Sequence, residues 1–380
     1  MSVARLRVAP VLPVYARQDL TFVRGEGTTL YDTDGHAYLD FLAGIAVVGL
    51  GHCHPAPLAA AQAQLDRLWH VSNLYWTEPM VELARRLSAR AGGARAFFCN
   101  SGSESVEAGL KYARKATGKP GIVALNGSFH GRTIGALSVT GQPAKRAAFE
   151  PLLPHVQFAN PNDVASLEAA ISADTGCVLL EPVQGEGGVH VLEASFVAAA
   201  RRLADKTGAV LLFDEVQTGV GRTGSFFAHE RLDVRADGVM LAKGLANGLP
   251  IGCLLVYDDA PEGFAAGDHA STFGGNPVTC AAATAVCDEL TDEFLATVTA
   301  NGLVLAAGLA ELDGIRAVRG AGLMLGAELD CPPAQVVLAC AERGLLVGTA
   351  GTDVLRLTPP LIVTAAEIEQ ALAVLEEVLT

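Results

Sequence analysis

The chain has 380 residues, of which 50% are hydrophobic and 18% are charged, so it is long and apolar enough to bury a large core. Its net charge of −14, from 27 basic and 41 acidic residues, argues against nucleic acid or an anionic membrane as a partner, because both require a basic face. An anionic small substrate stays compatible with this charge, because local arginines can bind one inside an acidic protein.

The eight cysteines form no Cys-x-x-Cys motif, and most lie among apolar residues. We interpret them as reduced, buried thiols of a cytosolic protein. The N-terminal residues contain no continuous apolar region of signal-peptide length, and no apolar run approaches the roughly 18–20 residues that span a bilayer. The composition therefore predicts a cytoplasmic protein without a membrane partner.

Residues 1–50 predict an extended, irregular segment that contains one β-hairpin. The runs 29–32 and 37–40 favour strands, and they flank Asp34-Gly35, a dipeptide typical of hairpin turns. From about residue 56 the spacing of apolar residues becomes helical, which predicts helices over 57–69 and 78–89.

Strands and helices then alternate to about residue 290. The predicted strands are 96–99, 121–125, 176–181, 209–213, 239–242 and 253–256, and the predicted helices are 104–116, 195–207 and 277–290. Such alternation predicts an α/β fold, with a mainly parallel sheet covered by helices on both faces. Ligand sites of these sheets lie at the carboxyl ends of the strands.

After residue 290 the pattern is that of a smaller α+β unit. Its predicted helices are 303–312, 336–343 and 364–379, and its predicted strands are 324–329 and 354–357. We therefore predict a large domain over 51–290 and a small domain over 291–380. The N-terminal segment 1–50 is expected to pack with the small domain.

Two predicted strands end in ionisable residues that together indicate one chemistry. Lys243 follows the run 239–242, and Asp214 ends the run 209–213. A buried lysine loses its charge readily, so its neutral amine can attack a carbonyl and form a Schiff base. An acid against the far side of the same cofactor holds a pyridinium nitrogen protonated, as a pyridoxal phosphate enzyme requires. The simpler alternatives are a surface lysine and a salt-bridged structural aspartate.

Two loops are candidates for binding phosphate. The loop 100–105 lies between a strand and a helix, where small residues admit a ligand and the helix N-terminus offers unpaired N–H groups. Its alternative is an ordinary helix cap at Ser103 with an acidic first turn. The hydroxyl-rich loop 271–277 likewise either holds a phosphate or caps the helix that follows it.

Three further segments carry groups for a planar or carboxylate ligand. Phe129 and Arg132 either stack on a cofactor and bind a carboxylate, or form a turn with a surface arginine. Glu181 and Glu186 lie on a Gly-rich loop after a strand, so they are either solvated acids, which is the ordinary case, or functional acids at the C-terminal end of that strand. Arg356 lies between apolar residues of a strand, so it either reaches a carboxylate or points to solvent on an edge.

The segment His52-Cys53-His54 contains two residue types that commonly bind metals, so a metal site is one interpretation of it. We predict no metal there, because no third ligand is nearby and the setting is a Gly/Pro turn. The aromatic and polar stretch 69–73 that follows either lines a pocket or simply ends a helix.

Taken in this order, the segments resemble one family over nearly the whole chain. The sequence is identified as a member of the class III (subgroup II) aminotransferases, which are pyridoxal phosphate enzymes of fold type I, and it is most similar to their acetylornithine-specific group. The segments that carry the resemblance are Gly44-Ile45-Ala46-Val47, Gly51-His52-Cys53-His54-Pro55, 70–75, 129–133, 214–219, 271–277 and Arg356-Leu357-Thr358-Pro359-Pro360.

The resemblance implies how the cofactor, pyridoxal 5′-phosphate, is held. Lys243 would carry it as a Schiff base and act as base and acid of the proton shift, and Asp214 would pair with its pyridine nitrogen. The other implied contacts are Gln217 to the ring oxygen, Phe129 and Val216 to the ring faces, Gly102 and Ser103 to the phosphate, and Thr272 to the phosphate from the second subunit of a homodimer.

The resemblance also implies the substrates and their contacts. Arg132 and Ser271 would hold the acetylornithine end, and Arg356 would take the α-carboxylate of glutamate. Glu186 would act as a switch that pairs with Arg356 when the amine donor leaves that arginine unused. The implied reaction moves the terminal amino group of acetylornithine to 2-oxoglutarate by a ping-pong mechanism, in arginine biosynthesis.

The chain departs from the family pattern at two places. The phosphate helix reads Glu104-Ser105-Val106-Glu107-Ala108 instead of Glu-Ala-Asn-Glu-Ala, and Ala270 replaces a glycine. We expect both changes to affect loop geometry only.

The nearest alternative function is that of another ω-aminotransferase, for ornithine, succinylornithine, 4-aminobutyrate or a carrier-bound lysine precursor. A non-catalytic binding protein would lose the lysine or the aspartate, and a Schiff-base aldolase would not need Asp214.

Overall fold

The computed structural model describes residues 10–380, so residues 1–9 of the predicted N-terminal segment lie outside it. At its centre is a seven-stranded sheet with the order β4-β12-β11-β10-β7-β5-β6. The strands are β4 (Ala94–Cys99), β5 (Gly121–Leu125), β6 (Val156–Ala159), β7 (Thr175–Leu180), β10 (Val210–Asp214), β11 (Gly238–Leu241) and β12 (Gly252–Tyr257). β12 is antiparallel to both of its neighbours and the other pairs are parallel, so the predicted α/β class with a mainly parallel sheet is confirmed.

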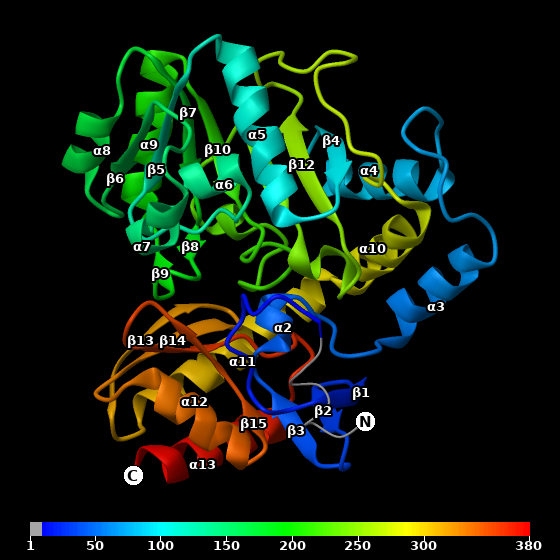
Figure 1. Cartoon of the computed structure of the whole chain (residues 1–380), viewed down its shortest axis with the longest axis vertical. Coiled ribbons are helices and arrows are strands. Elements are labelled where there is room, and N and C mark those ends of the chain that lie inside the picture. The colour runs from blue at the N-terminus through cyan, green and yellow to red at the C-terminus, as the bar shows by residue number, and fades with distance from the viewer. Residues whose placement is uncertain (1–9) are drawn as a thin grey trace.

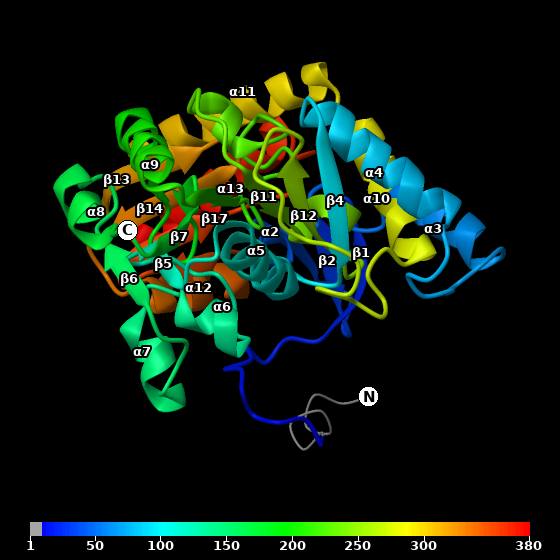
Figure 2. The same cartoon turned by 90° about the horizontal axis from the view of Figure 1, so that it is seen from above.

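Helices cover both faces of this sheet, as Figure 2 shows for α5 and α9 on opposite sides. Alternate residues of β10 enter different apolar clusters: Val210 and Leu212 belong to the cluster with α5, whereas Leu211 and Phe213 belong to the larger one. Both faces are therefore buried, which explains why the strand reads as a continuous apolar run. The helices of this region are α3 (Pro55–Leu65), α4 (Glu78–Arg90), α5 (Gly102–Thr117), α6 (Ile134–Ser138), α7 (Pro143–Arg146), α8 (Val164–Ala170), α9 (Ala194–Thr207) and α10 (Pro277–Glu289).

Segments from both ends of the chain share one smaller sheet, with the order β1-β2-β3-β15 (Figure 1). A second small sheet has the order β13-β14-β17-β16. The elements are β1 (Phe22–Glu26), β2 (Thr29–Asp32), β3 (Ala37–Asp40), β13 (Ile315–Ala321), β14 (Met324–Leu329), β15 (Leu345–Leu346), β16 (Gly348–Ala350), β17 (Val354–Leu357), α2 (Ala43–Ala46), α11 (Asp292–Ala310), α12 (Pro333–Glu342) and α13 (Ala365–Leu379). The domain boundaries at residues 50 and 290 stay a prediction.

Several elements differ from the sequence-based expectation. Helix α11 begins at Asp292 instead of 303, because the hydroxyl of Thr291 caps it by accepting the N–H of Phe294 at 3.2 Å. Helix α3 ends at Leu65 instead of 69. The elements without a predicted counterpart include β1, β6, β13 and α8, whose short and partly exposed sequences contain no clear apolar period.

Helix α11 is long and apolar enough, by length and composition alone, to cross a membrane, which the search for apolar runs did not anticipate. In the fold it packs on β13, β14 and α13. The residues that it buries are Leu295, Val298, Gly302, Leu305 and Leu309, which lie along one stripe of the helix. This stripe is the buried face of α11, whereas other apolar residues of the helix, among them Leu303 and Val304, are exposed.

All eight cysteines are free thiols, but the expectation that they are buried is wrong for two of them, since Cys53 and Cys331 are exposed. The neighbours of Cys53 have structural partners. Nε2 of His52 lies 2.8 Å from Oδ2 of Asp40, and Nδ1 of His54 accepts the N–H of Ala56 at the start of α3.

Candidate active site

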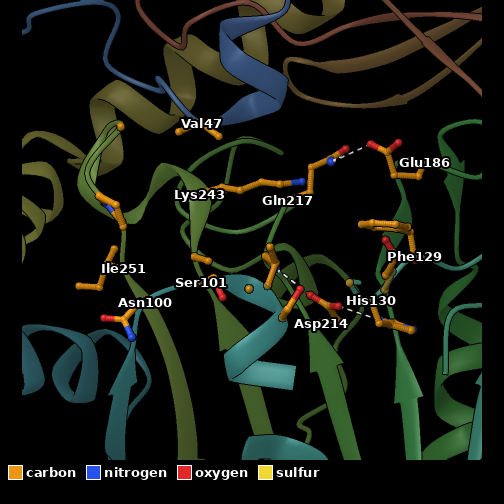
Figure 3. Close-up of a pocket in the computed structure, with 18 of the residues that line it drawn as sticks. Val47, Asn100, Ser101, Phe129, His130, Glu186, Asp214, Gln217, Lys243 and Ile251 are labelled. Carbon is orange, nitrogen blue, oxygen red and sulfur yellow. Dashed lines mark hydrogen bonds and ion pairs between the residues drawn. The ribbon is translucent and has the colours of Figure 1, made fainter. Parts of the chain in front are cut away.

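The carboxyl ends of three neighbouring strands meet at a cavity of about 290 Å³. Asp214 ends β10, Glu181 follows β7, and Lys243 lies two residues beyond β11. These strands are adjacent and parallel, so their ends lie at the same edge of the sheet. Figure 3 shows the labelled side chains around this cavity. The lining residues include Asn100, Ser101, Gly102, Ser103, Phe129, His130, Glu181, Glu186, Asp214, Val216, Gln217 and Lys243.

Lys243 combines a desolvated amine with an unusual backbone. It begins a short 3₁₀ helix, Lys243–Ala246, with a φ of 42°, in the left-handed region that residues other than glycine rarely adopt. Burial lowers the pKa of Lys243 to about 8, although the charge of Glu186 opposes the shift. A substantial fraction of this amine is therefore neutral near physiological pH and available for attack on a carbonyl.

Asp214 is held from two sides at the floor of the cavity. Its Oδ1 accepts the N–H of Val216 at 3.0 Å, and its Oδ2 lies 2.7 Å from Nδ1 of His130. Burial disfavours a charge on His130, but the hydrogen bond and charge of Asp214 outweigh it and raise the pKa of that histidine. His130 thus fixes the position of the Asp214 carboxylate at the cavity.

The residue next to Asp214 points away from the cavity into a structural network. The carboxylate of Glu215 accepts the N–H groups of Ala228 at 2.6 Å and His229 at 2.9 Å, and it lies 2.6 Å from Nδ1 of His229. Nε2 of His229 lies 3.1 Å from the hydroxyl of Tyr257 on β12. The two acids at the tip of β10 thus have separate tasks: Glu215 anchors the following chain while Asp214 faces the cavity.

The N-terminus of α5 forms one wall of the cavity. The helix cap is Ser101, whose Oγ accepts the N–H of Glu104 at 3.3 Å, so the alternative that Ser103 caps this helix is wrong. Ser103 instead accepts the N–H of Arg132 at 3.3 Å. A Cβ on Gly102 would lie 2.5 Å from Cγ1 of Val216, so only glycine permits this close approach. The 16-residue helix directs its partial positive charge at the cavity.

Phe129 and Gln217 lie beside a pair of opposite charges. The N–H of Phe129 donates to Glu181 at 2.9 Å, which fixes the loop that carries the ring. The amide of Gln217 contacts both members of the charged pair: its Nε2 donates to Glu186 at 3.5 Å, and its Oε1 accepts from Arg356 at 3.3 Å.

The charged pair joins Glu186 to Arg356, and Arg356 is only 3% exposed. Its strand β17 pairs with β14 on one side and β16 on the other, so the alternative of an edge arginine pointing to solvent is wrong. Burial disfavours the charge of Glu186, but Arg356 outweighs it and lowers the pKa of Glu186.

Four of the predicted site residues do not line the cavity. Arg356 is one of them, and it contacts the lining residues Glu186 and Gln217. Arg132 is exposed, with Cζ 5.6 Å from the centroid of the Phe129 ring. The hydroxyl of Ser271 accepts from Nδ2 of the lining residue Asn100 at 3.2 Å. Thr272 is exposed. The following helix α10 is capped by Asn276, whose Oδ1 accepts the N–H of Val278 at 2.9 Å.

The sequence did not indicate a role for His130, although this residue lies between Phe129 and Arg132. Its loop position carried no signal of burial, and its partner Asp214 is 84 residues away in sequence. For Glu181 the sequence left open whether it is a solvated loop acid or a functional acid at the end of its strand. It is in fact buried, and burial raises its pKa.

These residues fit pyridoxal phosphate. An amine of lowered pKa, a carboxylate fixed by His130, a flat aromatic side chain and a helix N-terminus for the phosphate surround one cavity (Figure 3). When bound, pyridoxal phosphate supplies an electron sink for the bonds at the carbon that carries the amino group.

Known proteins agree with this geometry. The family model described as aminotransferase class-III matches residues 14–379. The acetylornithine aminotransferase of Caldanaerobacter subterraneus subsp. tengcongensis is 45% identical over 97% of this chain and 97% of its own. Among solved structures, the ornithine aminotransferase of Toxoplasma gondii ME49 has a TM-score of 0.94 and 29% identity, covering 100% of this chain and 95% of its own. The N-acetylornithine aminotransferase of Stenotrophomonas maltophilia K279a has a TM-score of 0.83 and 36% identity, covering 96% of each chain. The chain therefore belongs to the class-III aminotransferases, which are transaminases that depend on pyridoxal phosphate.

Proposed function

We propose that the protein transfers the terminal amino group of N²-acetyl-L-ornithine to 2-oxoglutarate, giving N-acetyl-L-glutamate 5-semialdehyde and L-glutamate. The observation that carries the proposal is the ion pair of Glu186 with Arg356 at the cavity that contains Lys243. The sequence relatives support the choice of substrate, because acetylornithine aminotransferases match at 43–48% identity along nearly the whole chain. We assign the enzyme to arginine biosynthesis in the cytoplasm.

In this proposal Lys243 would hold the cofactor, and its amine would accept and release the proton that moves when the amino group is transferred. Its lowered pKa allows the amine both to accept and to release that proton near neutral pH. Asp214, supported by His130, would keep the pyridine nitrogen protonated. Phe129 and Val216 would enclose the ring, Gln217 would contact its oxygen, and the α5 N-terminus at Gly102 and Ser103 would bind the phosphate.

The charged pair explains how one cavity accepts two kinds of amine donor. Glutamate brings an α-carboxylate beside its reacting amine, and Arg356 is the cation that binds it once Glu186 withdraws. The terminal amine of acetylornithine has no carboxylate beside it, so Glu186 stays paired with Arg356 and satisfies that buried charge. Arg132 and Ser271 hold the far end of the acetylated donor.

We further propose a homodimer in which Thr272 reaches the phosphate of the partner's site. Thr272 lies in an exposed apolar surface made by residues 69–76 and Phe273, where Leu74 is 84% exposed and Trp76 is 85% exposed. The side chain of Asn73 ties the two segments together by donating to the carbonyls of Ser271 and Gly274, both at 2.8 Å. A second copy would remove this apolar area from water.

Ornithine is the second candidate donor, because the ornithine aminotransferase of Toxoplasma gondii has a TM-score of 0.94. Single-turnover reactions of the cofactor-loaded protein with acetylornithine, succinylornithine, ornithine and 4-aminobutyrate separate the candidates. For each amine, the rate constant of the reaction is divided by the dissociation constant of the amine. We expect this ratio to be largest for acetylornithine. A larger value for ornithine would replace the proposal with the second candidate, and reaction with none of these amines would refute both.

The role of Lys243 has a direct chemical test. Borohydride reduction of the loaded protein should fix the cofactor to the peptide that contains Lys243, as seen by mass spectrometry, and the Lys243→Ala variant should retain no cofactor covalently. Labelling of a different lysine would contradict the assignment.

A further inference from the structure

A lysine outside the predicted site lies beside the ring of Phe129. Lys145 belongs to the short helix α7, and its Nζ lies 5.2 Å from the centroid of the Phe129 ring. Cζ of Arg132 lies 5.6 Å from the same centroid. Two cations therefore flank one aromatic side chain of the cavity wall.

Neither cation is neutralised by the protein. Within residues 10–380, no carboxylate forms an ion pair with Lys145 or with Arg132, although the chain has 41 acidic and only 27 basic residues. The ammonium of Lys145 donates to the neutral amide oxygen of Gln142. Glu186 is the acid that most favours the charge on Lys145, but it is already paired with Arg356.

A hydrogen bond to Gln142 holds Lys145 in a position where burial disfavours its positive charge. Nε2 of Gln142 donates to the carbonyl of Gly127 at 3.1 Å, so the partner of Lys145 is itself fixed to the backbone. Burial lowers the pKa of Lys145, and the positive charges of Arg132 and Arg356 lower it further. A lysine side chain is long and flexible enough to place its ammonium in solvent. Because Lys145 instead lies partly buried beside Phe129, its position indicates an anionic ligand.

We propose that Lys145 is a substrate-binding residue that, together with Arg132, binds the carboxylate lying farther from the reacting carbon. This inference rests on the proposed function, in which acetylornithine presents its α-carboxylate and 2-oxoglutarate its distal carboxylate at this end of the cavity. The guanidinium offers two parallel donors, and the ammonium adds a point charge from a separate helix. Two cations, Lys145 and Arg132, thus bind the end of both substrates that does not react, while Arg356 lies at the reacting end.

Direct binding of glutarate tests this inference without requiring turnover. Glutarate has two carboxylates with the spacing of 2-oxoglutarate and no reactive carbonyl, and its dissociation constant for the cofactor-loaded protein can be measured by calorimetry. We expect Lys145→Met to raise this constant roughly tenfold, as the loss of one charge-assisted hydrogen bond predicts. Lys145→Arg should stay within about threefold of the unchanged protein, because it keeps the charge.

The matched control is Lys206→Met, which removes an exposed lysine from the last turn of α9 and should leave glutarate binding unchanged. Lys145→Gln serves as a second neutral variant if Lys145→Met lowers the melting temperature. Binding of glutarate by the neutral variants within about twofold of the unchanged protein would overturn the inference.

Steady-state kinetics provide a second readout. Lys145→Met should raise KM for 2-oxoglutarate roughly tenfold and change kcat by less than about twofold, since the lysine contacts a part of the substrate that does not react. Loss of kcat at unchanged KM would contradict a binding role. If the unchanged protein transaminated ornithine but not acetylornithine, the proposed function would fail while the glutarate result would still decide the role of Lys145.

Discussion

Lys243 brings together a strained backbone and a desolvated amine at the tip of β11. The left-handed φ of 42° lies at the point where the chain leaves the sheet, and burial beside the cavity desolvates the amine. Strain of this kind persists only where the neighbouring structure fixes it, and it is common in functional sites. Here it places the amine over the cavity that contains Asp214.

The lowered pKa of Lys243 predicts how fast cofactor-free protein captures pyridoxal phosphate at different pH values. Only the neutral amine attacks, so below about pH 8 the capture rate should rise with pH, and above that value it should level off. Stopped-flow absorbance measures the rate. A lysine with the ordinary pKa of 10.5 would give a rate that keeps rising beyond pH 10, and that result would contradict the burial of the amine.

His130 is expected to act on the cofactor through Asp214. Replacing it in His130→Phe removes the 2.7 Å contact and leaves one oxygen of Asp214 without that partner. We expect cofactor affinity to fall roughly tenfold, as the loss of a buried hydrogen bond to a charged group predicts. Equilibrium dialysis of the protein against pyridoxal phosphate gives the dissociation constant.

The control for this variant is His229→Phe, which removes an equally buried histidine from the Glu215 network. Because Glu215 points away from the cavity, this change should lower the melting temperature and leave cofactor affinity nearly unchanged. Equal losses of affinity in both variants would show that the effect of His130 is one of general stability.

At the scale of elements, the close contact between α5 and the chain after β10 shapes the phosphate end of the cavity. The two elements come from distant parts of the sequence, and they meet where Gly102 touches Val216. The helix N-terminus can approach the ligand only because no side chain separates the two.

The variant Gly102→Ala should therefore weaken cofactor binding. The new Cβ would lie 2.5 Å from Cγ1 of Val216, so either Val216 or the first turn of α5 must move. We expect the dissociation constant for pyridoxal phosphate to rise about tenfold or more, as overpacking by one methyl group predicts. Fluorescence titration of the cofactor measures this change.

Gly118→Ala is the matched control at the other end of the same helix. Gly118 has a φ of 68° and no atom within 4 Å of a new Cβ, so this change strains the backbone without a clash. It should lower the free energy of unfolding by about 1 kcal/mol and leave cofactor affinity unchanged. A loss of affinity in Gly118→Ala would show that helix stability, and not the contact with Val216, limits cofactor binding.

At the scale of the whole molecule, the exposed surface of residues 69–76 and Phe273 should join two copies. In Trp76→Glu an 85% exposed tryptophan becomes charged, so a dimer that buries this position should dissociate. Sedimentation velocity should show a shift toward the monomer, and activity should fall in parallel because Thr272 no longer reaches the partner's cavity.

The control is Leu303→Glu, at a 68% exposed position on α11 and outside this surface. It should leave both the sedimentation coefficient and the activity unchanged. A Trp76→Glu protein that sediments as the unchanged protein does would contradict the proposed interface.

The sequence by itself determined much of the local structure. The predicted bounds of β5, β14 and β17 match the structure, because each is a short apolar run with turn residues on both sides. The alternation of strands and helices predicted the parallel sheet, and that sheet implied that residues at strand ends gather at one edge. Lys243 and Asp214 were identified on these grounds.

Only the tertiary structure decided which of those residues meet and what each one contacts. Glu186 and Arg356 are 170 residues apart, and His130 and Asp214 are 84 residues apart. Ser101 caps α5, Arg356 lies in an inner strand, and Lys145 lies against Phe129. Local patterns report the period and the ends of an element, whereas these contacts depend on strand order and on how separate elements pack. Burial then sets the pKa of Lys243, because desolvation depends on every neighbour that packing brings to the amine.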